Sequence, residues 1–489
     1  MLYNNFLKKY PFFRLVNRFY SSLSYIYLMA FMTFVSEVFS FEIPVYYFYV
    51  FFGLLLPALF CEDMKSFLAP VFFGYFSVSL KTNQGEIGVT LFRKENFPHL
   101  IALITLIFLI TLSRILYGVI RKEHHPRPKL LIGYLLLALI FPLGGLFSPY
   151  YSLKNAEYGL LVSFSYLVPF LLSYYLVDYT TLRKDYFAHL LVALGLLLSG
   201  ELVVIYITHF DNLPNGTFQG GLIRTGWGIK NNIGGMLALS IVGPFYLALK
   251  KKRMPFYLLL NLFFLTMVSL TESRGSLLVA VFTETILFIT GLVHVRKQPL
   301  QYLLTFLGAL LCSVLILFLL RLRFPSIMDY VISTLKHLTL EKLASGRLEL
   351  WTYGISYFRE NPILGGGYYR LPDSYRMNFF LTDFMPLRMH NTYIQLLSST
   401  GIIGLLAYLY HRFESAILIF RRLTTEKLFV FFFYLLFLGC SAVDCHFFNI
   451  GPALLYSVMA AIAEGLDQIE ESKSDNLRKT LTRRIDVTE

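Results

Sequence analysis

The sequence predicts an all-α polytopic membrane protein with about 12 to 14 transmembrane helices and a large, partly helical extracytoplasmic loop. Of the 489 residues, 56% are hydrophobic and only 15% are charged, and the mean hydropathy is +0.60. Soluble domains carry about 25% charged residues. Apolar runs long enough to cross a bilayer recur along the whole chain. The short segments that join these runs are alternately rich and poor in basic residues. This composition excludes an ordinary soluble enzyme.

Each predicted span rests on length. A bilayer core needs about 20 apolar residues per helix, and helices and closed barrels are the structures that satisfy the backbone there. The first apolar run follows a basic stretch and has no small-residue cleavage site after it, so we expect an uncleaved first span. Fourteen spans are predicted, near 22–41, 44–61, 64–80, 99–119, 130–148, 157–177, 186–208, 232–249, 254–271, 274–293, 300–320, 392–410, 428–446 and 451–465.

The basic residues predict the orientation. With the N-terminus in the cytoplasm, 26 Lys and Arg fall on the inner side and 16 on the outer side. Nine of those 16 belong to the single segment 321–391, and long loops are exempt from the positive-inside rule. We therefore expect both termini in the cytoplasm. The net charge of +13 follows from this topology and gives no reason to expect nucleic acid as a partner.

The predicted spans divide the chain into four parts. These are a transmembrane bundle of spans one to eleven (1–320), an extracytoplasmic cap loop (321–391), spans twelve to fourteen (392–465) and a cytoplasmic tail (466–489). A loop of this length is usually functional or disordered. This one keeps a helical apolar rhythm at Leu348, Trp351, Ile355 and Phe358, so we expect a folded cap with at least one helix lying on the bundle.

Three predicted helix starts on the outer side carry a basic residue. Arg274 begins the tenth span, Ser345 can cap a loop helix with Arg347 in its first turn, and His390 precedes Asn391, which can cap the twelfth span. A helix N-terminus offers unpaired N–H groups and the positive end of a dipole. Together these groups predict a site for a multiply charged anion such as a diphosphate.

Each of these residues also has a structural interpretation. An arginine at a span boundary can extend to phospholipid headgroups, and an arginine or a histidine on the cap can simply be solvated. Arg224, Lys230 and Arg388 lie on the same side and are further candidates for substrate binding, although each also fits an ordinary polar loop residue. No metal-ligand spacing is apparent in the outer segments, and no cofactor is expected.

Three polar residues near or within spans have weaker functional interpretations. Glu201 lies inside the seventh span, where a carboxyl is either a site residue or a buried hydrogen-bond partner. Asp444 and His446, near the outer end of the thirteenth span, could support the site, but solvation at the interface is favoured. The glycines at 365–367 are not followed by the Lys-Ser/Thr of a phosphate-binding loop, so a tight turn under the cap is expected.

The outer motifs resemble a known family. Arg347-x-x-x-Trp351, then 361-NPILGGGYY-369 and then 390-HNTYIQLLSSTGIIG-404 are similar to the signature of the O-antigen ligase/polymerase superfamily. The start of a span at Ser273-Arg274-Gly275 is similar to that family's upstream arginine motif. The motifs cover roughly 225–410, and the large outer loop between two late spans also matches. One departure is the span count, since the family usually has about a dozen.

The resemblance implies a metal-independent glycosyltransferase of the bacterial cell envelope, with a membrane fold of the lipid-sugar transferase (GT-C-like) type. Its donor would be a glycan on undecaprenyl diphosphate at the outer leaflet of the inner membrane. It would transfer that glycan, with inversion, to a hydroxyl of a glycan, lipid or protein acceptor. Carried over by motif, Arg274 and Arg347 would hold the diphosphate, and His390 would activate or position the acceptor.

Two alternatives remain open at this stage. The sequence does not decide between a polymerase, which joins lipid-linked repeats to one another, and a ligase, which moves the finished glycan to a different acceptor. A protein of another class, a flippase or other transporter of lipid-linked oligosaccharides, also fits fourteen spans. Transporters are commonly built from repeated halves, and no repeat is evident in this sequence.

Overall fold

The computed structural model is almost entirely helical, with one short hairpin in the described part. It describes residues 10–61, 64–77, 94–120, 126–179, 183, 185–208, 223–225, 228–250, 253–294, 299–323, 347–369, 388–421 and 423–485. Ser345, predicted to cap a loop helix, lies outside these residues, as does much of the segment 321–391. The hairpin pairs β1 (Arg224–Thr225) with β2 (Gly228–Ile229) in antiparallel register.

The helices follow the apolar runs of the sequence closely. In the first half they are α2 (Pro11–Tyr20), α3 (Leu23–Phe39), α4 (Glu42–Phe48), η1 (Tyr49–Leu55), α5 (Leu56–Phe60), η2 (Met64–Phe67), α6 (Leu68–Phe76), η4 (Lys94–Asn96), α7 (Phe97–Ile120), α8 (Leu131–Ile140), η5 (Phe141–Leu143), α9 (Leu153–Leu176) and α10 (Tyr186–Thr208). In the second half they are α11 (Lys230–Ser240), α12 (Val242–Leu249), α13 (Met254–Leu270), α14 (Arg274–His294), α15 (Pro299–Arg323), α18 (Arg347–Glu360), α20 (Thr392–Phe420), α21 (Thr425–Val443), η8 (His446–Phe448) and α22 (Ile450–Ile485).

Every predicted span overlaps a helix, but fewer than fourteen of the described helices are long enough to cross a bilayer. Among the described residues, ten helices meet the length and hydropathy of a span, or eleven if the bent pair α2 and α3 counts as one. The polytopic all-α fold is thereby confirmed. The predicted spans at 64–80, 130–148 and 254–271 correspond to shorter helices, because α6 ends at Phe76, α8 gives way to η5 at Phe141 and α13 has 17 residues.

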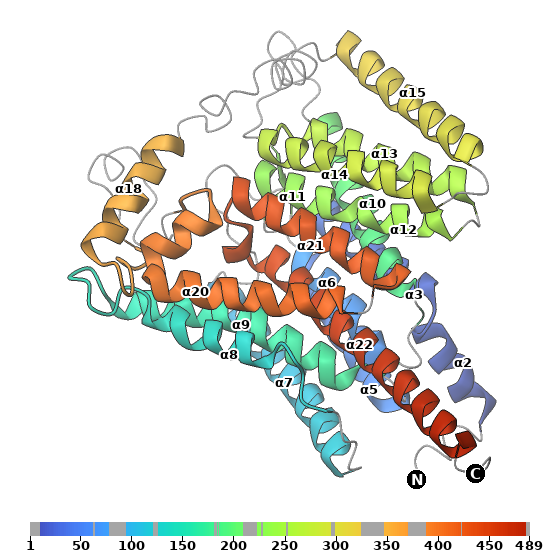
Figure 1. Ribbon diagram of the computed structural model, residues 1–489, viewed down its shortest axis with the longest axis horizontal. Coiled ribbons are helices and arrows are strands. Elements are labelled where there is room, and N and C mark those ends of the chain that lie inside the picture. The colour runs from blue at the N-terminus through green and yellow to red at the C-terminus, as the bar shows by residue number, and fades with distance from the viewer. Residues whose placement is uncertain are drawn as a thin grey trace.

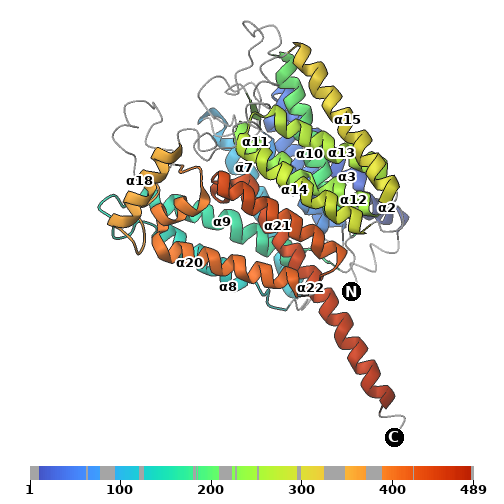
Figure 2. The same cartoon turned by 45° about the horizontal axis from the view of Figure 1, so that its top comes forward.

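The helices form two groups joined by α21 and α22. Helices α10 to α14 lie side by side in one group, whereas α8, α9 and the long α20 lie together in the other (Figure 1). Helix α21 packs against α14 and α20, and α22 packs closely against α9. The last turns of α22 extend beyond the bundle in both views (Figures 1 and 2). The predicted spans thirteen and fourteen therefore link the two groups.

One end of the bundle is held together by a cluster of ion pairs. Lys427 and Lys129 both contact the carboxylate of Asp467, each at 2.5 Å between nitrogen and oxygen, and Arg421 pairs with Glu471 at 3.3 Å. These residues come from segments that the basic-residue pattern assigns to the cytoplasm. The cap helix α18 lies at the opposite end (Figure 1). The chain thus has one strongly ion-paired end and one end that carries the cap.

The cap helix packs on the start of α20, as expected, but its buried face is rotated from the predicted one. Leu350 and Tyr357 form a small apolar cluster with Met389, and the indole N–H of Trp351 donates to the Met389 carbonyl at 2.8 Å. Leu348, which the apolar rhythm placed on the buried face, is 41% exposed. Trp351, which packs against this cluster, therefore belongs to both the predicted and the observed buried face of the helix.

Helix α20 is broken at Gly401, and the turn after α18 fills the break. Gly401 has φ 66° and ψ −161°, a conformation that is essentially restricted to glycine. The N–H groups of Gly366 and Gly367 donate to carbonyls of α20 before the break, and the N–H groups of Ile402 and Ile403 after it donate to Pro362 and Ile363. Gly365 and Gly367 have positive φ, so the predicted tight turn is present under the cap.

We predict that Gly401→Ala destabilises the fold. A Cβ there would overlap the carbonyl oxygen of Ile363 and hold a left-handed backbone that costs about 1–3 kcal/mol. The matched control is Gly308→Ala in α15, where a Cβ meets no atom within 4 Å and alanine favours the helix by about 0.5–1 kcal/mol. Thermal unfolding in detergent should show a lower midpoint for the first variant alone. Equal midpoints would contradict this account of the break.

Candidate functional site

The candidate site lies where two chain segments run beside each other at the cap end. Residues 388–392 lead into α20, and residues 442–448 lead out of α21. Four side chains tie them together: Arg388 donates to the Phe448 carbonyl, His390 binds Asp444, and Asn391 and Thr392 donate to the carbonyls of Ala442 and Asp444, all at 2.9–3.2 Å. The two segments therefore form one antiparallel unit.

Asp444 is the centre of this unit. Its Oδ1 accepts from the Nδ1–H of His390 at 3.0 Å and from the backbone N–H of Cys445 at 2.6 Å. The guanidinium of Arg347 lies 3.9 Å from Oδ2 and donates to the carbonyl of Val443. The Asp444 side chain is only 8% exposed, whereas that of His390 is 31% exposed. A buried carboxylate thus orients a histidine that remains accessible.

The charges around Asp444 keep its carboxylate ionised. Burial raises the pKa of the Asp444 carboxyl, but the hydrogen bond from His390 and the electrostatic effects of His390, His446 and Arg347 lower it more, so the pKa lies well below its ordinary value. Burial lowers the pKa of the neighbouring His446 imidazole, against the opposing effect of Asp444. The site therefore holds a fixed negative charge that is satisfied from three directions.

The backbone of His390 is unusual. Its φ is 49°, in the left-handed region that residues other than glycine seldom adopt. The neighbouring residues maintain this conformation, since Met389 donates its N–H to the side chain of Gln395 and accepts from Trp351. Asn391 caps α20 by accepting from the N–H groups of Tyr393 and Ile394. Such strain is common at functional sites, where the surrounding structure fixes a side chain in one direction.

Arg274 approaches the same place from another helix. It is the first residue of α14, and a Cβ added to the next residue, Gly275, would lie 2.8 Å from the Cβ of Val443. The start of α14 also packs on α11, where a Cβ at Gly234 would lie 2.8 Å from Ser273. The N-termini of α11, α14, α18 and α20 therefore surround the segment 442–449. Their dipoles favour an anion there.

The remaining candidates are distributed around this centre. Lys230 begins α11 and its Nζ lies 4.0 Å from the carboxylate of Glu272. Arg388 has its guanidinium 5.8 Å from the ring centroid of Tyr158. Arg224 belongs to β1, but its side chain lies outside the described residues. The structure thus brings Arg274, Arg347, Arg388, His390 and Asn391 to the 442–448 segment, with Lys230 at the nearby helix start.

The prediction that Asp444 and His446 are solvated at the membrane interface was wrong. Both residues are buried, with exposed fractions of 6% and 0%. A short turn places them between α21 and α22, beneath the segment 388–390, and the hydropathy of the sequence does not show that contact. Glu201 is fully buried in α10 beside Glu37 and Thr225, and neither of its carboxyl oxygens has a hydrogen-bond partner in the described part, so its role as a site residue or as a buried partner stays undecided.

The arrangement has the parts of a site for proton transfer beside an anion. Because Nδ1–H of His390 donates to Asp444, the other ring nitrogen, Nε2, is left as the acceptor in the neutral ring. A carboxylate that fixes the tautomer of a histidine in this way prepares it to act as a base. A guanidinium has five N–H donors, and Arg347 has one of them on Val443, so others remain for a ligand.

We predict that Asp444→Asn destabilises the protein by about 1.5–3 kcal/mol, the range for a hydrogen bond to a charged group. Since the pKa of Asp444 is depressed, its contribution is present above the ordinary value of 3.8 and is lost as the pH falls below it. Thermal midpoints of the variant and the wild type should therefore differ from pH 8 to about pH 5 and converge in stronger acid. Glu157→Gln, at an exposed position of α9, is the control. A difference that is absent at neutral pH would contradict the role of Asp444.

The comparisons agree with the motifs. Residues 256–409 match the family described as O-Antigen ligase, whereas no curated protein matches the chain. The matched region contains Arg274, Arg347 and His390 but ends before Asp444. The match indicates an O-antigen ligase or polymerase type of function in glycan assembly. The resemblance to the O-antigen ligase/polymerase superfamily is thereby confirmed over residues 256–409, which match an O-antigen ligase domain.

Proposed function

We propose that this protein is an inverting, metal-independent glycosyltransferase of the bacterial inner membrane. It moves a glycan from undecaprenyl diphosphate to an acceptor hydroxyl on the outer face, as a repeat-unit polymerase or as an O-antigen-type ligase. The observation that carries the proposal is the carboxylate of Asp444, which binds His390 through one oxygen and faces Arg347 with the other. The carboxylate of Asp444 thereby holds a base, His390, close to an anion-binding group, Arg347.

The chemistry follows from these groups. The acceptor hydroxyl attacks the anomeric carbon of the donor sugar and transfers its proton to Nε2 of His390. The bond from the anomeric carbon to the diphosphate breaks, and its electron pair moves to the bridging oxygen. Asp444 stabilises the imidazolium that forms, as the carboxylate of a catalytic triad does. A positioned histidine base accelerates such a step by about 10²–10⁴-fold.

Arg347 and Arg274 stabilise the leaving group. Negative charge on the diphosphate grows as the bond breaks, so fixed guanidinium groups bind the transition state more strongly than the ground state. The helix N-termini of α14 and α18, which carry these two arginines, add their dipoles. Two guanidinium groups and the helix ends would thus serve where other phosphate-binding enzymes use a metal ion.

The charge distribution supports an extracytoplasmic position for the candidate site. The ion-paired end, with Lys129, Arg421 and Lys427, contains the segments that the positive-inside rule assigns to the cytoplasm. The candidate site lies at the opposite end, with the cap, which we infer to be extracytoplasmic. Helix α2 and the last turns of α22 lie toward the ion-paired end (Figure 1), in keeping with cytoplasmic termini.

One observation bears on the transporter alternative, because broken helices near substrate sites are typical of transporters. Helix α20 is broken at Gly401. The backbone groups on both sides of this break are hydrogen-bonded to the turn at 361–367. In the described part of the chain they therefore stabilise the fold. The predicted site residues Arg274, Arg347 and Arg388 also gather at the cap end of the bundle. These features favour the transferase.

We predict that His390→Asn lowers the rate of glycan joining about 10²–10⁴-fold, since asparagine tolerates the left-handed backbone but supplies no base. Arg347→Lys keeps the charge but loses the planar fork, and should lower the rate about 10²–10³-fold. Arg359→Lys, exposed in the last turn of α18, is the control. The assay incubates purified protein with lipid-linked repeats, with and without a second acceptor, and follows chain length.

The outcomes separate the two classes of protein. No product with any acceptor, together with unchanged surface glycans in a deletion strain, would contradict the transferase. Normal joining by His390→Asn would remove the histidine from the mechanism. Movement of the lipid-linked repeat across vesicle membranes that survives alanine substitution of Arg274, Arg347 and His390, while joining is never affected, would favour the transporter.

A further inference from the structure

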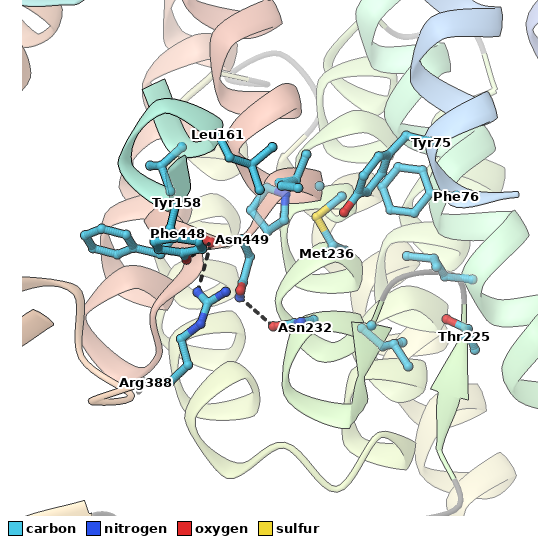
Figure 3. Close-up of a pocket in the computed structure, with 17 residues that line it drawn as sticks. Tyr75, Phe76, Tyr158, Leu161, Thr225, Asn232, Met236, Arg388, Phe448 and Asn449 are labelled. Carbon is cyan, nitrogen blue, oxygen red and sulfur yellow. Dashed lines mark hydrogen bonds between the residues drawn. The ribbon is translucent and has the colours of Figure 1, made fainter. Parts of the chain in front are cut away.

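A cavity of about 220 Å³ opens beside the candidate site. It lies between α6, α9, α10 and α11, under the hairpin and against the start of α22. Most of its wall is apolar, including Met236. Its polar groups include the guanidinium of Arg388, the amides of Asn232 and Asn449, the hydroxyl of Thr225 and the tyrosines Tyr75 and Tyr158 (Figure 3). Among the predicted site residues whose side chains the structure describes, Arg388 lines the cavity and the others do not.

The cavity is within reach of His390. Arg388 lies two residues before His390, so their Cα atoms are at most about 7 Å apart. Phe448 and Asn449 line the cavity from the other segment, a few residues after Asp444. The paired segments therefore have two ends: one bears Val443 and Asp444 with Arg347, and the other borders the cavity. His390 stands between them.

The polar groups of the cavity fit a sugar ring. The amide of Asn449 donates to the side-chain oxygen of Asn232 at 2.7 Å, which leaves an N–H donor on Asn232 and an oxygen acceptor on Asn449. A neighbouring donor and acceptor match adjacent hydroxyl groups. Aromatic rings such as Tyr158 offer apolar faces to the C–H surface of a pyranose. A few placed polar groups in an apolar wall are typical of a ligand site.

We propose that this cavity is the acceptor subsite, which holds the sugar ring whose hydroxyl attacks the donor. The inference rests on the proposed transferase. The donor diphosphate binds at Arg347 and Arg274, the acceptor sugar enters from the side of Arg388, and Nε2 of His390 takes the proton between them. The new bond to the anomeric carbon forms on the face opposite the breaking bond to the diphosphate, so the placement of the two subsites itself produces inversion.

The main competing occupant is the prenyl chain of the donor. A prenyl chain would bury the guanidinium of Arg388 and the two amides without new hydrogen bonds, and leaving buried polar groups unpaired is costly. A sugar ring satisfies them. The proposal therefore commits to a carbohydrate, and the prenyl chain becomes an outcome of the test.

The test uses the full-length protein in lipid nanodiscs and two cavity variants. Met236→Trp fills the cavity, and Asn232→Leu removes the amide pair without adding bulk, in case the first variant fails to fold. Met32→Trp, on the partly buried face of α3, and Asn17→Leu in α2 are matched controls away from the cavity. The donor probe is a polyprenyl-diphosphate-linked repeat, and the acceptor probe is the same repeat freed of lipid.

We expect both cavity variants to raise the KM for the lipid-free acceptor at least tenfold, with kcat changed less than threefold for Asn232→Leu. Their affinity for polyprenyl diphosphate without sugar should equal that of the wild type, and the controls should match the wild type in every measurement. An unchanged acceptor KM in both variants, with active wild type, would overturn the acceptor subsite alone. Lost affinity for the sugar-free lipid, with a normal acceptor KM, would overturn it in favour of the prenyl chain.

A wild type that joins nothing would overturn the proposed transferase, and the cavity is then tested by calorimetric titration with the lipid-free repeat. Binding to the wild type that is lost in Met236→Trp and Asn232→Leu would still support a carbohydrate site. No binding to the wild type, or equal binding to all variants, would overturn it.

Discussion

The structure at the cap end depends on the buried carboxylate of Asp444. Its carboxylate binds His390 and faces Arg347, and these two residues come from the end of the cap loop and from the start of the cap helix α18. A buried carboxylate without partners is strongly disfavoured, whereas one that receives hydrogen bonds and faces cations is stable as an anion. The same contacts that satisfy Asp444 therefore fix the direction of the histidine ring and draw the start of α18 onto the bundle.

The fold supplies this carboxylate by joining helix ends. The turn between α21 and α22 is short, so the end of one and the start of the other lie under the capped start of α20. The starts of α11 and α14 pack on the same turn. A rigid cluster of helix ends suits the binding of a charged group better than a single loop does, because little rearrangement is needed when charge develops.

Hydropathy was enough to predict where the helices lie, because burial in lipid selects apolar runs directly. It overestimated the number of full spans, since α6, α8 and α13 are apolar throughout yet end early. Motifs and helix starts also pointed to Arg274, Arg347 and His390. The contact with Asp444 could not be predicted, because it joins residues 54 positions apart through tertiary packing. The cavity beside Arg388 was missed for the same reason, as its wall comes from six separate segments of the chain.

The most direct test is the structure of the protein in a lipid nanodisc with an uncleaved lipid-linked repeat bound. The account predicts the diphosphate oxygens within about 2.7–2.9 Å of the guanidinium nitrogens of Arg347 and Arg274, the usual range for charge-assisted hydrogen bonds. It also predicts the anomeric carbon facing the ring of His390. A diphosphate bound at the ion-paired end near Lys129, or midway through the bundle, would contradict it.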